Sequence, residues 1–383
     1  MSTENLELTV IMPCLNESDT IGTCIRKALT CMQENNIKGE VLIADNGSTD
    51  NSAELAIKAG AKVIHVTEKG YGAALIGATK VANGIYCIMG DADDSYDFSN
   101  LMPYILKLRE GFDLVMGNRF KGGIDRDAMP LLHKHLGTPV ISFLGRLFYH
   151  NTIGDFNCGM RGYNRSKILE LNLQTTGMEY ASEMIVKSSL NKLNITEVPT
   201  PLHRDGRSRP PHLNTWSDGW RHLKFLLLHS PNWLFLYPGI VLSIIGLVLM
   251  ALLIIAPLTI NKISFDINSL LFGCTFLLMG VNAILFSCYT RIYAFMTEYI
   301  PPDKLTNKIS KFASDKGIFI GAILFILGVV LSIISLIAWS NKSFGDLEPQ
   351  VIMRLTIPAA FMMMIGLEIM FGGFFIGILK IKH

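Results

Sequence analysis

The chain has 383 residues, with 34 lysines and arginines against 32 aspartates and glutamates. Half of the residues are hydrophobic and 17% are charged, which excludes a disordered chain and is too apolar for an ordinary soluble enzyme. The balanced charge gives no sign of nucleic-acid binding. Charged residues concentrate before residue 233, so the sequence predicts a soluble domain followed by a membrane domain.

The first part of the chain alternates short apolar runs with helical patterns. We expect strands at 8–13, 40–45, 61–66, 85–91 and 113–118, and helices near 18–34, 50–59, 71–82 and 98–110. This alternation predicts an α/β domain with a mostly parallel sheet. Such sheets bind ligands at the carboxyl ends of their strands, where the polar motifs of this chain fall.

Two polar motifs follow the first two expected strands. In PCLNES (13–18), Asn16 and Glu17 either cap the next helix or bind a polar ligand such as a base or ribose. In ADNGSTD (44–50), Asp45 is placed to reach a ligand, while Gly47 permits a tight turn. Ligand binding and a purely structural turn both remain open at this point.

A third motif, GDADDS (90–95), crowds the carboxylates of Asp91, Asp93 and Asp94 into four residues after an apolar run. Their mutual repulsion is costly unless a divalent cation or solvent relieves it. Hard oxygen ligands suit Mg²⁺ or Mn²⁺, which in turn hold the phosphates of a substrate. The motif therefore favours a metal site over a plain acidic turn.

Basic side chains follow these motifs. Arg119 and Lys121 come just after the strand expected at 113–118, and Asp155 lies in the later segment GDFNCGMRGYNR. The segment 203–212 adds a cluster of arginines, namely Arg204, Arg207 and Arg209. Arginine binds phosphate through two parallel hydrogen bonds, so phosphate binding is expected, with attraction to lipid headgroups as the alternative.

Residues 213–232 join the two parts of the chain. Trp216, Trp220, Leu223 and Leu228 recur there at helical spacing beside basic residues. This pattern predicts an amphipathic helix at the bilayer surface, with an ordinary domain helix as the alternative. The expected domains are accordingly 1–212, 213–232 and 233–383.

Four apolar stretches are long enough to cross a bilayer. They lie at roughly 234–257, 270–296, 318–340 and 355–379. Lysines and arginines alternate between abundant and sparse in the segments between them, which places both termini and the soluble domain in the cytoplasm of an inner-membrane protein. Glu368, inside the fourth stretch, is expected to hydrogen-bond a neighbouring helix.

The motifs PCLNE, DNGSTD and the DAD of GDADDS, in that order and spacing, resemble the inverting family-2 glycosyltransferases of the GT-A fold. GNRF, GDFNCGMRGY, EYASEMIVK and GRSRPP are similar to segments of the polyprenyl-phosphate glycosyltransferases, such as dolichyl-phosphate mannose synthases and undecaprenyl- or dolichyl-phosphate glucose synthases. The resemblance covers about residues 7–230. The QxxRW motif of processive polysaccharide synthases is absent, which argues against chain polymerisation.

The resemblance implies site residues. Those expected to hold the nucleotide sugar are Pro13, Asn16, Glu17, Asp45, Asp91 and Arg207. Those expected at the metal, Mg²⁺ or Mn²⁺, are Asp91, Asp93 and Ser95, the last replacing a glutamine of the mannose synthases. Those expected at the lipid phosphate are Arg119, Lys121, Arg204 and Arg209, and Asp155 would line the junction of donor and acceptor.

The function that the resemblance implies is transfer of a hexose from a nucleotide-diphosphate sugar to a polyprenyl phosphate, with inversion. UDP-glucose is favoured as donor and GDP-mannose comes next. One alternative is transfer to another membrane lipid such as diacylglycerol, with Asp155 as general base; another is a catalytically silent scaffold or lipid-sugar transporter. The expected partners are the nucleotide sugar, the lipid phosphate, the membrane and, in a homo-oligomer, further copies of the chain.

Overall fold

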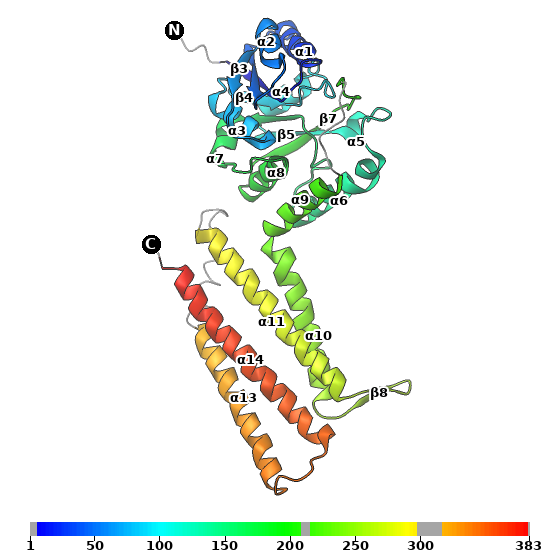
Figure 1. The fold of residues 1–383 in the computed structure, drawn as a ribbon, viewed down its shortest axis with the longest axis vertical. Helices are drawn as coiled ribbons and strands as arrows, with labels where there is room; N and C mark the ends of the chain where they lie inside the picture. The colour runs from blue at the N-terminus through cyan, green and yellow to red at the C-terminus, as the bar shows by residue number, and fades with distance from the viewer. Residues whose placement is uncertain (1–5, 208–214, 297–315, 382–383) are drawn as a thin grey trace. The chain divides into compact units, whose positions relative to one another are not determined.

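The computed structural model describes residues 6–207, 215–296 and 316–381, so the expected phosphate ligand Arg209 lies outside the described residues. The chain divides into two compact units, Met1–His229 and Ser230–His383 (Figure 1). The first unit holds the sheet and the polar motifs, and the second holds the long apolar helices.

The first unit is built on a mostly parallel seven-stranded sheet, as the sequence predicts. Its strands are β1 (Leu8–Cys14), β2 (Gly39–Asp45), β3 (Lys62–His65), β4 (Tyr86–Met89), β5 (Leu114–Asn118), β6 (Arg161–Asn164) and β7 (Ile195–Pro199). The strand order is β3-β2-β1-β4-β6-β5-β7, and β6 runs antiparallel to both of its neighbours. The five strands expected from the apolar runs are present, whereas β6 and β7 were not expected.

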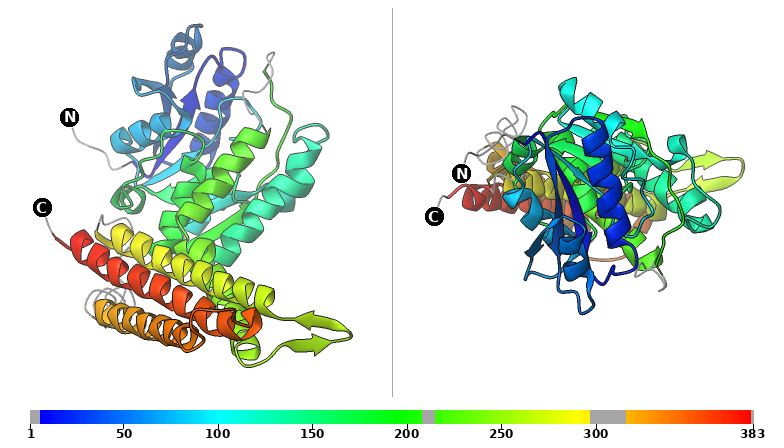
Figure 2. Two further views of the ribbon diagram at one scale, coloured as in Figure 1. Left: turned by 60° about the horizontal axis from the view of Figure 1, so that its bottom comes forward. Right: turned by 90° about the horizontal axis from the view of Figure 1, so that it is seen from above.

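Helices cover both faces of this sheet (Figure 2). Because side chains alternate along a strand, Val10 and Met12 of β1 face one helical layer and Ile11 faces the other. The first layer comprises α1 (Ile21–Glu34), α2 (Ser52–Lys58) and α4 (Met102–Arg109). The second comprises α3 (Tyr71–Val81), α6 (Thr138–Tyr149), α7 (Arg165–Glu170), α8 (Tyr180–Leu190) and α9 (Thr215–Leu228).

The helix expected at 213–232 is α9, and it packs on α6 and α8 of the first unit. Leu226 is fully buried, and its carbonyl oxygen accepts a hydrogen bond from the Tyr149 hydroxyl (2.7 Å). Trp220 and Leu228 remain 61% and 59% exposed. The first compact unit therefore includes α9 and extends to His229, while the expected domain bounds and contact of the exposed side of α9 with a bilayer stay predictions.

Within residues 230–296 and 316–381, the second unit contains four helices long and apolar enough to span a membrane. The spans are Asn232–Leu253, which comprises the π-helix η2 (Asn232–Leu236) and α10 (Tyr237–Leu253), then α11 (Ile267–Met296), α13 (Gly317–Ser340) and α14 (Pro349–Leu379). The helices α10 and α11 pack together, α11 packs on α14, and α14 packs on α13 (Figure 1). A short hairpin, β8 (Leu258–Ile260) and β9 (Ile263–Phe265), connects α10 to α11 and was not expected.

Glycines bring the helices of each neighbouring pair into backbone contact. A Cβ atom at Gly246 would lie 2.6 Å from the carbonyl oxygen of Gly273, and one at Gly366 would lie 2.7 Å from that of Gly321. Small residues give membrane helices close van der Waals contact where no hydrophobic effect drives association. Between the pairs, Asn282 Nδ2 donates to Glu368 Oε1 (3.0 Å), the interhelical hydrogen bond expected for Glu368.

Candidate active site

The loop after β4 holds the carboxylates expected at the metal. Asp93 is 7% exposed, and its Oδ1 accepts hydrogen bonds from the backbone N–H (3.1 Å) and hydroxyl (2.6 Å) of Ser95. The hydroxyl of Ser95 therefore orients Asp93, and the place of Ser95 at the metal stays a prediction. Asp94 turns away in the left-handed region (φ 61°) and pairs with Lys27 (2.7 Å).

Asp91 has an unusual electrostatic environment. Its enclosure by the surrounding protein, and next the negative charge of Asp93, raise the pKa of Asp91 to about 7. A hydrogen bond with Tyr71 and the charges of Arg207 and Arg119 act in the opposite direction without cancelling that effect. A divalent cation between the two carboxylates would remove the repulsion, so these residues fit a metal of the Mg²⁺ or Mn²⁺ type.

Two protein carboxylates alone leave such a cation incompletely coordinated. Among the described residues, no group of three histidine, cysteine, aspartate or glutamate side chains is arranged to hold a metal ion. Mg²⁺ in particular is bound in many enzymes by one or two carboxylates together with substrate phosphates. The residues present therefore fit a cation that arrives with a phosphate-bearing substrate.

The first two polar motifs interlock at the carboxyl ends of β1 and β2. The Oδ1 atom of Asn16, whose φ is +60°, accepts a hydrogen bond from the backbone N–H of Thr49 (2.7 Å). The residue at the start of α1 is Thr20, without a side-chain cap, so the expectation that Asn16 caps this helix was wrong. Pro13 lies at the end of β1, opposite Ala44.

Asp45 ends β2 as an ionised hydrogen-bond acceptor. Its carboxylate accepts from the backbone N–H of Gly47 (3.3 Å) and of Ser48 (3.2 Å), and lies 3.0 Å from His65 Nδ1. Burial acts to raise the pKa of Asp45, but these hydrogen bonds outweigh burial and hold it below its usual value. A carboxylate fixed in this way presents a constant negative charge beside the loop that carries Asn16.

Arg207 lies against the metal motif. Its Nη2 contacts Asp93 Oδ2 (2.9 Å) and Asp205 Oδ2 (2.9 Å), and its Nη1 lies 3.5 Å from Glu17 Oε1. The backbone holds this segment in place because the N–H of Gly206 donates to the carbonyl of Asp93 (2.9 Å). The structure thus brings Arg207, Glu17 and Asp93 together, as expected for one site.

Arg119 and Asp155 form a buried, two-pronged ion pair. Arg119 Nε donates to Asp155 Oδ2 (2.7 Å) and Nη2 donates to Oδ1 (2.8 Å). Arg119 is 9% exposed and Asp155 is fully buried. Both carboxylate oxygens of Asp155 therefore accept hydrogen bonds from Arg119, and Asp155 holds the guanidinium in place.

The remaining expected phosphate ligands are less enclosed. Lys121 is paired with Glu197 (2.5 Å), whose other oxygen accepts from the backbone N–H of Gly154 (2.7 Å). Arg204 is exposed on the surface. Of the described basic residues expected at the lipid phosphate, Arg119 alone has a buried and fixed guanidinium.

Comparisons with known proteins place this site in a family. The model of glycosyl transferase family 2 matches residues 9–171, and that of the family 2 C-terminal transmembrane region matches residues 288–380. A low-salt glycan biosynthesis hexosyltransferase of Haloferax volcanii is 33% identical over 372 residues, which cover 97% of this chain and 88% of the relative. The chain belongs to glycosyltransferase family 2.

Two further matches are a curated relative and a solved structure. A dolichyl-phosphate hexose transferase of Haloferax volcanii is 29% identical and covers 51% of this glycosyltransferase and 82% of its own length. A solved structure of glucosyl-3-phosphoglycerate synthase from Mycobacterium tuberculosis, in complex with Mn²⁺, UDP-glucose and phosphoglyceric acid, has 18% identity and a TM-score of 0.47, and the match covers 59% of this chain and 80% of that one. The protein is a multi-pass membrane glycosyltransferase related to polyprenyl-phosphate sugar transferases.

Sequence reasoning missed two supporting features of the glycosyltransferase site. Tyr71 hydrogen-bonds Asp91 from the start of α3. Glu183 of α8 accepts hydrogen bonds from the backbone N–H groups of Gln174 and Thr175, and the carbonyl of Thr176 in the same loop accepts from Ala73 N–H of α3 (3.1 Å). The available signal for Tyr71 was its position at the start of a helix that follows a strand of the parallel sheet.

Proposed function

We propose that this enzyme transfers a hexose from a nucleotide-diphosphate sugar to a polyprenyl phosphate, with inversion at the anomeric carbon. UDP-glucose is the favoured donor and GDP-mannose the next. The observation that carries the proposal is the buried Arg119, fixed by Asp155 and close enough to Asp91 that its charge acts on that carboxyl. A fixed guanidinium beside a metal motif suits a reaction that brings two phosphate groups together.

The reaction is a single in-line displacement. An oxygen of the lipid phosphate forms the new bond to the anomeric carbon while the bond from that carbon to the nucleoside diphosphate breaks. The attacking phosphate is already ionised near neutral pH, so positioning and charge stabilisation supply the catalysis. Arg119 would bind the attacking phosphate, and Arg207 would bind the departing diphosphate after leaving Asp93.

Asp91 and Asp93 are the residues that would hold the divalent cation. When bound, Mg²⁺ or Mn²⁺ supplies positive charge to the diphosphate leaving group. Ser95 keeps Asp93 in orientation through its backbone N–H and hydroxyl. The loops that carry Asn16 and Asp45 would form the wall for the nucleoside, since both end parallel strands of the same sheet.

The state of Asp155 favours a phosphate acceptor over a lipid hydroxyl. Transfer to diacylglycerol would require a general base to remove the hydroxyl proton. Asp155 is the candidate base, yet both of its oxygens accept hydrogen bonds from Arg119. An acceptor that is already anionic needs no such base, and it matches the cationic guanidinium that Asp155 holds.

A second surface supports an acceptor that resides in the bilayer. An exposed apolar row at helical spacing runs from the residue before η1 (His133–Gly137) into α6 and comprises Leu132, Leu136, Val140 and Phe143. The helix α6 packs on α9, which exposes Trp220. We propose that this row faces the cytoplasmic leaflet and that the first unit lies in the cytoplasm, with oligomerisation remaining a prediction.

The test is a donor panel with the full-length protein in detergent. Polyprenyl phosphate, Mn²⁺ or Mg²⁺ and each common UDP- or GDP-sugar would be mixed, and nucleotide release would be measured together with an organic-soluble sugar lipid. We expect product from one donor, abolished by EDTA and by Asp93→Ala, but unchanged by Glu170→Ala, which removes an exposed carboxylate on α7. Absence of lipid product with every donor, from folded protein, would overturn the proposal, and product with diacylglycerol alone would establish the alternative acceptor.

A further inference from the structure

The two helix pairs of the membrane unit, α10–α11 and α13–α14, share a sequence pattern. Gly239 and Gly246 of α10 have the same spacing as Gly321 and Gly328 of α13. The connection that follows each of these helices contains a similar segment, NKISFD at 261–266 directly before α11 and NKSFGD at 341–346 directly after α13. Recurrence of the same elements in the same order is the signature of a repeated structural unit.

The helix crossings repeat as well. A Cβ atom at Gly280 would lie 2.7 Å from the carbonyl oxygen of Gly239, and one at Gly366 would lie 2.7 Å from that of Gly321. The second crossing joins Gly246 to Gly273 (2.6 Å) in the first pair and Gly328 to Ala359 (2.8 Å) in the second. Corresponding residues of the two pairs therefore make corresponding contacts.

The helices α11 and α14 meet through their own equivalent residues. Asn282 and Glu368 are 86 residues apart and hydrogen-bonded (3.0 Å), and the same separation relates Gly280 to Gly366. Tyr289 and Phe375, again separated by this interval, pack edge to face with their ring centroids 5.1 Å apart. In a two-fold assembly, a residue touches its own equivalent only at the axis.

We infer that the membrane unit is a duplicated helix hairpin whose halves associate through a dimer-like interface between α11 and α14. The Asn282–Glu368 pair lies on the pseudo-two-fold axis of that interface. Each of these helices is the second of its pair, so they run in the same direction, as in a parallel coiled coil. The surface of α11 thus fits a second copy of its own hairpin, and in this chain the α13–α14 hairpin takes that place.

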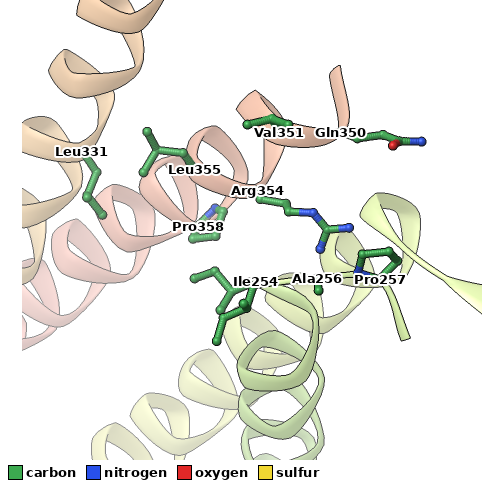
Figure 3. A pocket seen from close by; sticks show the side chains of 10 residues that line it. Ile254, Ala256, Pro257, Leu331, Gln350, Val351, Arg354, Leu355 and Pro358 are labelled. Carbon is green, nitrogen blue, oxygen red and sulfur yellow. The ribbon is translucent and has the colours of Figure 1, made fainter. Parts of the chain in front are cut away.

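The halves differ at one end of the unit. Arg354 of α14 stands where α11 has Asn268, and it donates to the carbonyl of Leu253 and to Asp266 of the first half. Pro358, which stands where α11 has Phe272, lines with Arg354 a cavity of about 570 Å³ (Figure 3). The contacts of Arg354 join the two halves away from the axis, where the two halves differ. The symmetry is therefore tested only at Asn282 and Glu368, which lie on the axis.

The test exchanges the two residues on the axis in the full-length protein. Asn282→Glu alone places two carboxylates opposite each other, while Asn282→Glu with Glu368→Asn rebuilds the pair in the reverse direction. A control, Val281→Glu with Glu368→Asn, moves the carboxylate one position off the axis. The readout is the apparent melting temperature in detergent, followed as the folded fraction that survives heating and gel filtration.

The double exchange is expected to restore most of the stability that Asn282→Glu removes. We expect Asn282→Glu alone to lower the apparent melting temperature by about 5 °C or more, and the double exchange to recover more than half of that loss. The apparent melting temperature of the control is expected to lie closer to that of Asn282→Glu alone than to that of the wild type. A double exchange that recovers less than half, a control that recovers as much, or a harmless Asn282→Glu would overturn the inference. None of these outcomes depends on the sugar-transfer activity.

Discussion

The two units of this glycosyltransferase bring distant residues together in opposite ways. In the first unit, Arg119 and Asp155 meet through charged side chains, and Arg207 meets Asp93 in the same way. In the membrane unit, Gly246 approaches the backbone of Gly273 because it has no side chain. The first unit therefore depends on side-chain atoms that a substitution can remove. The packing of the second unit depends on the absence of side-chain atoms, which a substitution can add.

The largest effect is expected at Asp93. Asp93→Asn keeps the shape of the side chain and an oxygen for Ser95 but removes the charge that would bind the cation. We expect turnover to fall by at least about 10²-fold while the melting temperature changes by no more than about 3 °C. Initial rates of sugar-lipid formation and a thermal scan of the same preparation measure both. Wild-type turnover in this variant would remove Asp93 from the site.

The ion pair between Arg119 and Asp155 is expected to matter for both activity and stability. Asp155→Asn leaves a buried guanidinium without its countercharge, so we expect a loss of about 3 kcal/mol in the free energy of unfolding and about 10²-fold in turnover. Arg119→Lys cannot make both hydrogen bonds and should raise the KM for the lipid phosphate more than that for the nucleotide sugar.

The matched control for this pair lies on the surface. Arg109 makes the same two-pronged contact with Glu7 (2.7 and 3.0 Å), but its side chain is 43% exposed. Arg109→Lys should change stability by less than about 1 kcal/mol and leave both KM values unaltered. Equal effects of the two substitutions on stability and KM would mean that burial does not explain the contribution of the pair between Arg119 and Asp155.

Two glycines of one membrane helix sharpen the comparison from the other side. A Cβ atom at Gly366 would lie 2.5 Å from the backbone nitrogen of Phe325, whereas one at Gly377 would meet nothing within 4 Å. Gly366→Ala should cost about 1–3 kcal/mol of stability in detergent, and Gly377→Ala should cost none. Turnover per folded molecule should stay constant in both variants. A loss of turnover without a loss of stability at Gly366 would contradict this division of roles.

The smallest expected effect is a pH dependence from Asp91. Its carboxyl keeps a proton in the folded chain up to about pH 7, whereas an unfolded chain releases that proton near pH 4. The folded state binds more protons in this interval, so the free energy of unfolding should fall as the pH rises from about 4 to 7. Thermal scans between pH 5 and 8 should show a shallower decline in Asp91→Asn than in the wild type.

A second carboxyl serves as the control for that measurement. Burial acts to raise the pKa of Asp97, but hydrogen bonds from Ser99 outweigh it and lower the pKa below its usual value. The stability that Asp97 contributes is therefore lost only as the pH falls toward 4 or below. Asp97→Asn should leave the decline between pH 5 and 8 unchanged, and a change there would show that Asp91 is not its source.

The sequence predicted the parts of the molecule that follow from local pattern. Apolar runs located five strands, so Asp45 and Asp91 were correctly placed at strand ends, and hydropathy located the four spans. The partner of Asp155 was out of reach because a carboxylate near a binding site can act as a base or hold a guanidinium, and only the fold decides. The pairing of β6 between β4 and β5, far apart in the chain, was also invisible to local pattern.

The glycine crossings have a consequence for how the chain is made. Because α10 and α11 contact each other through Gly246 and Gly273, the first hairpin contains its own packing surface before α13 has been synthesised. The same holds for α13 and α14 through Gly321 and Gly366. Units with local contacts can form during synthesis from the N-terminus onward. The two helix pairs can therefore insert into the membrane one after the other, each already packed against itself.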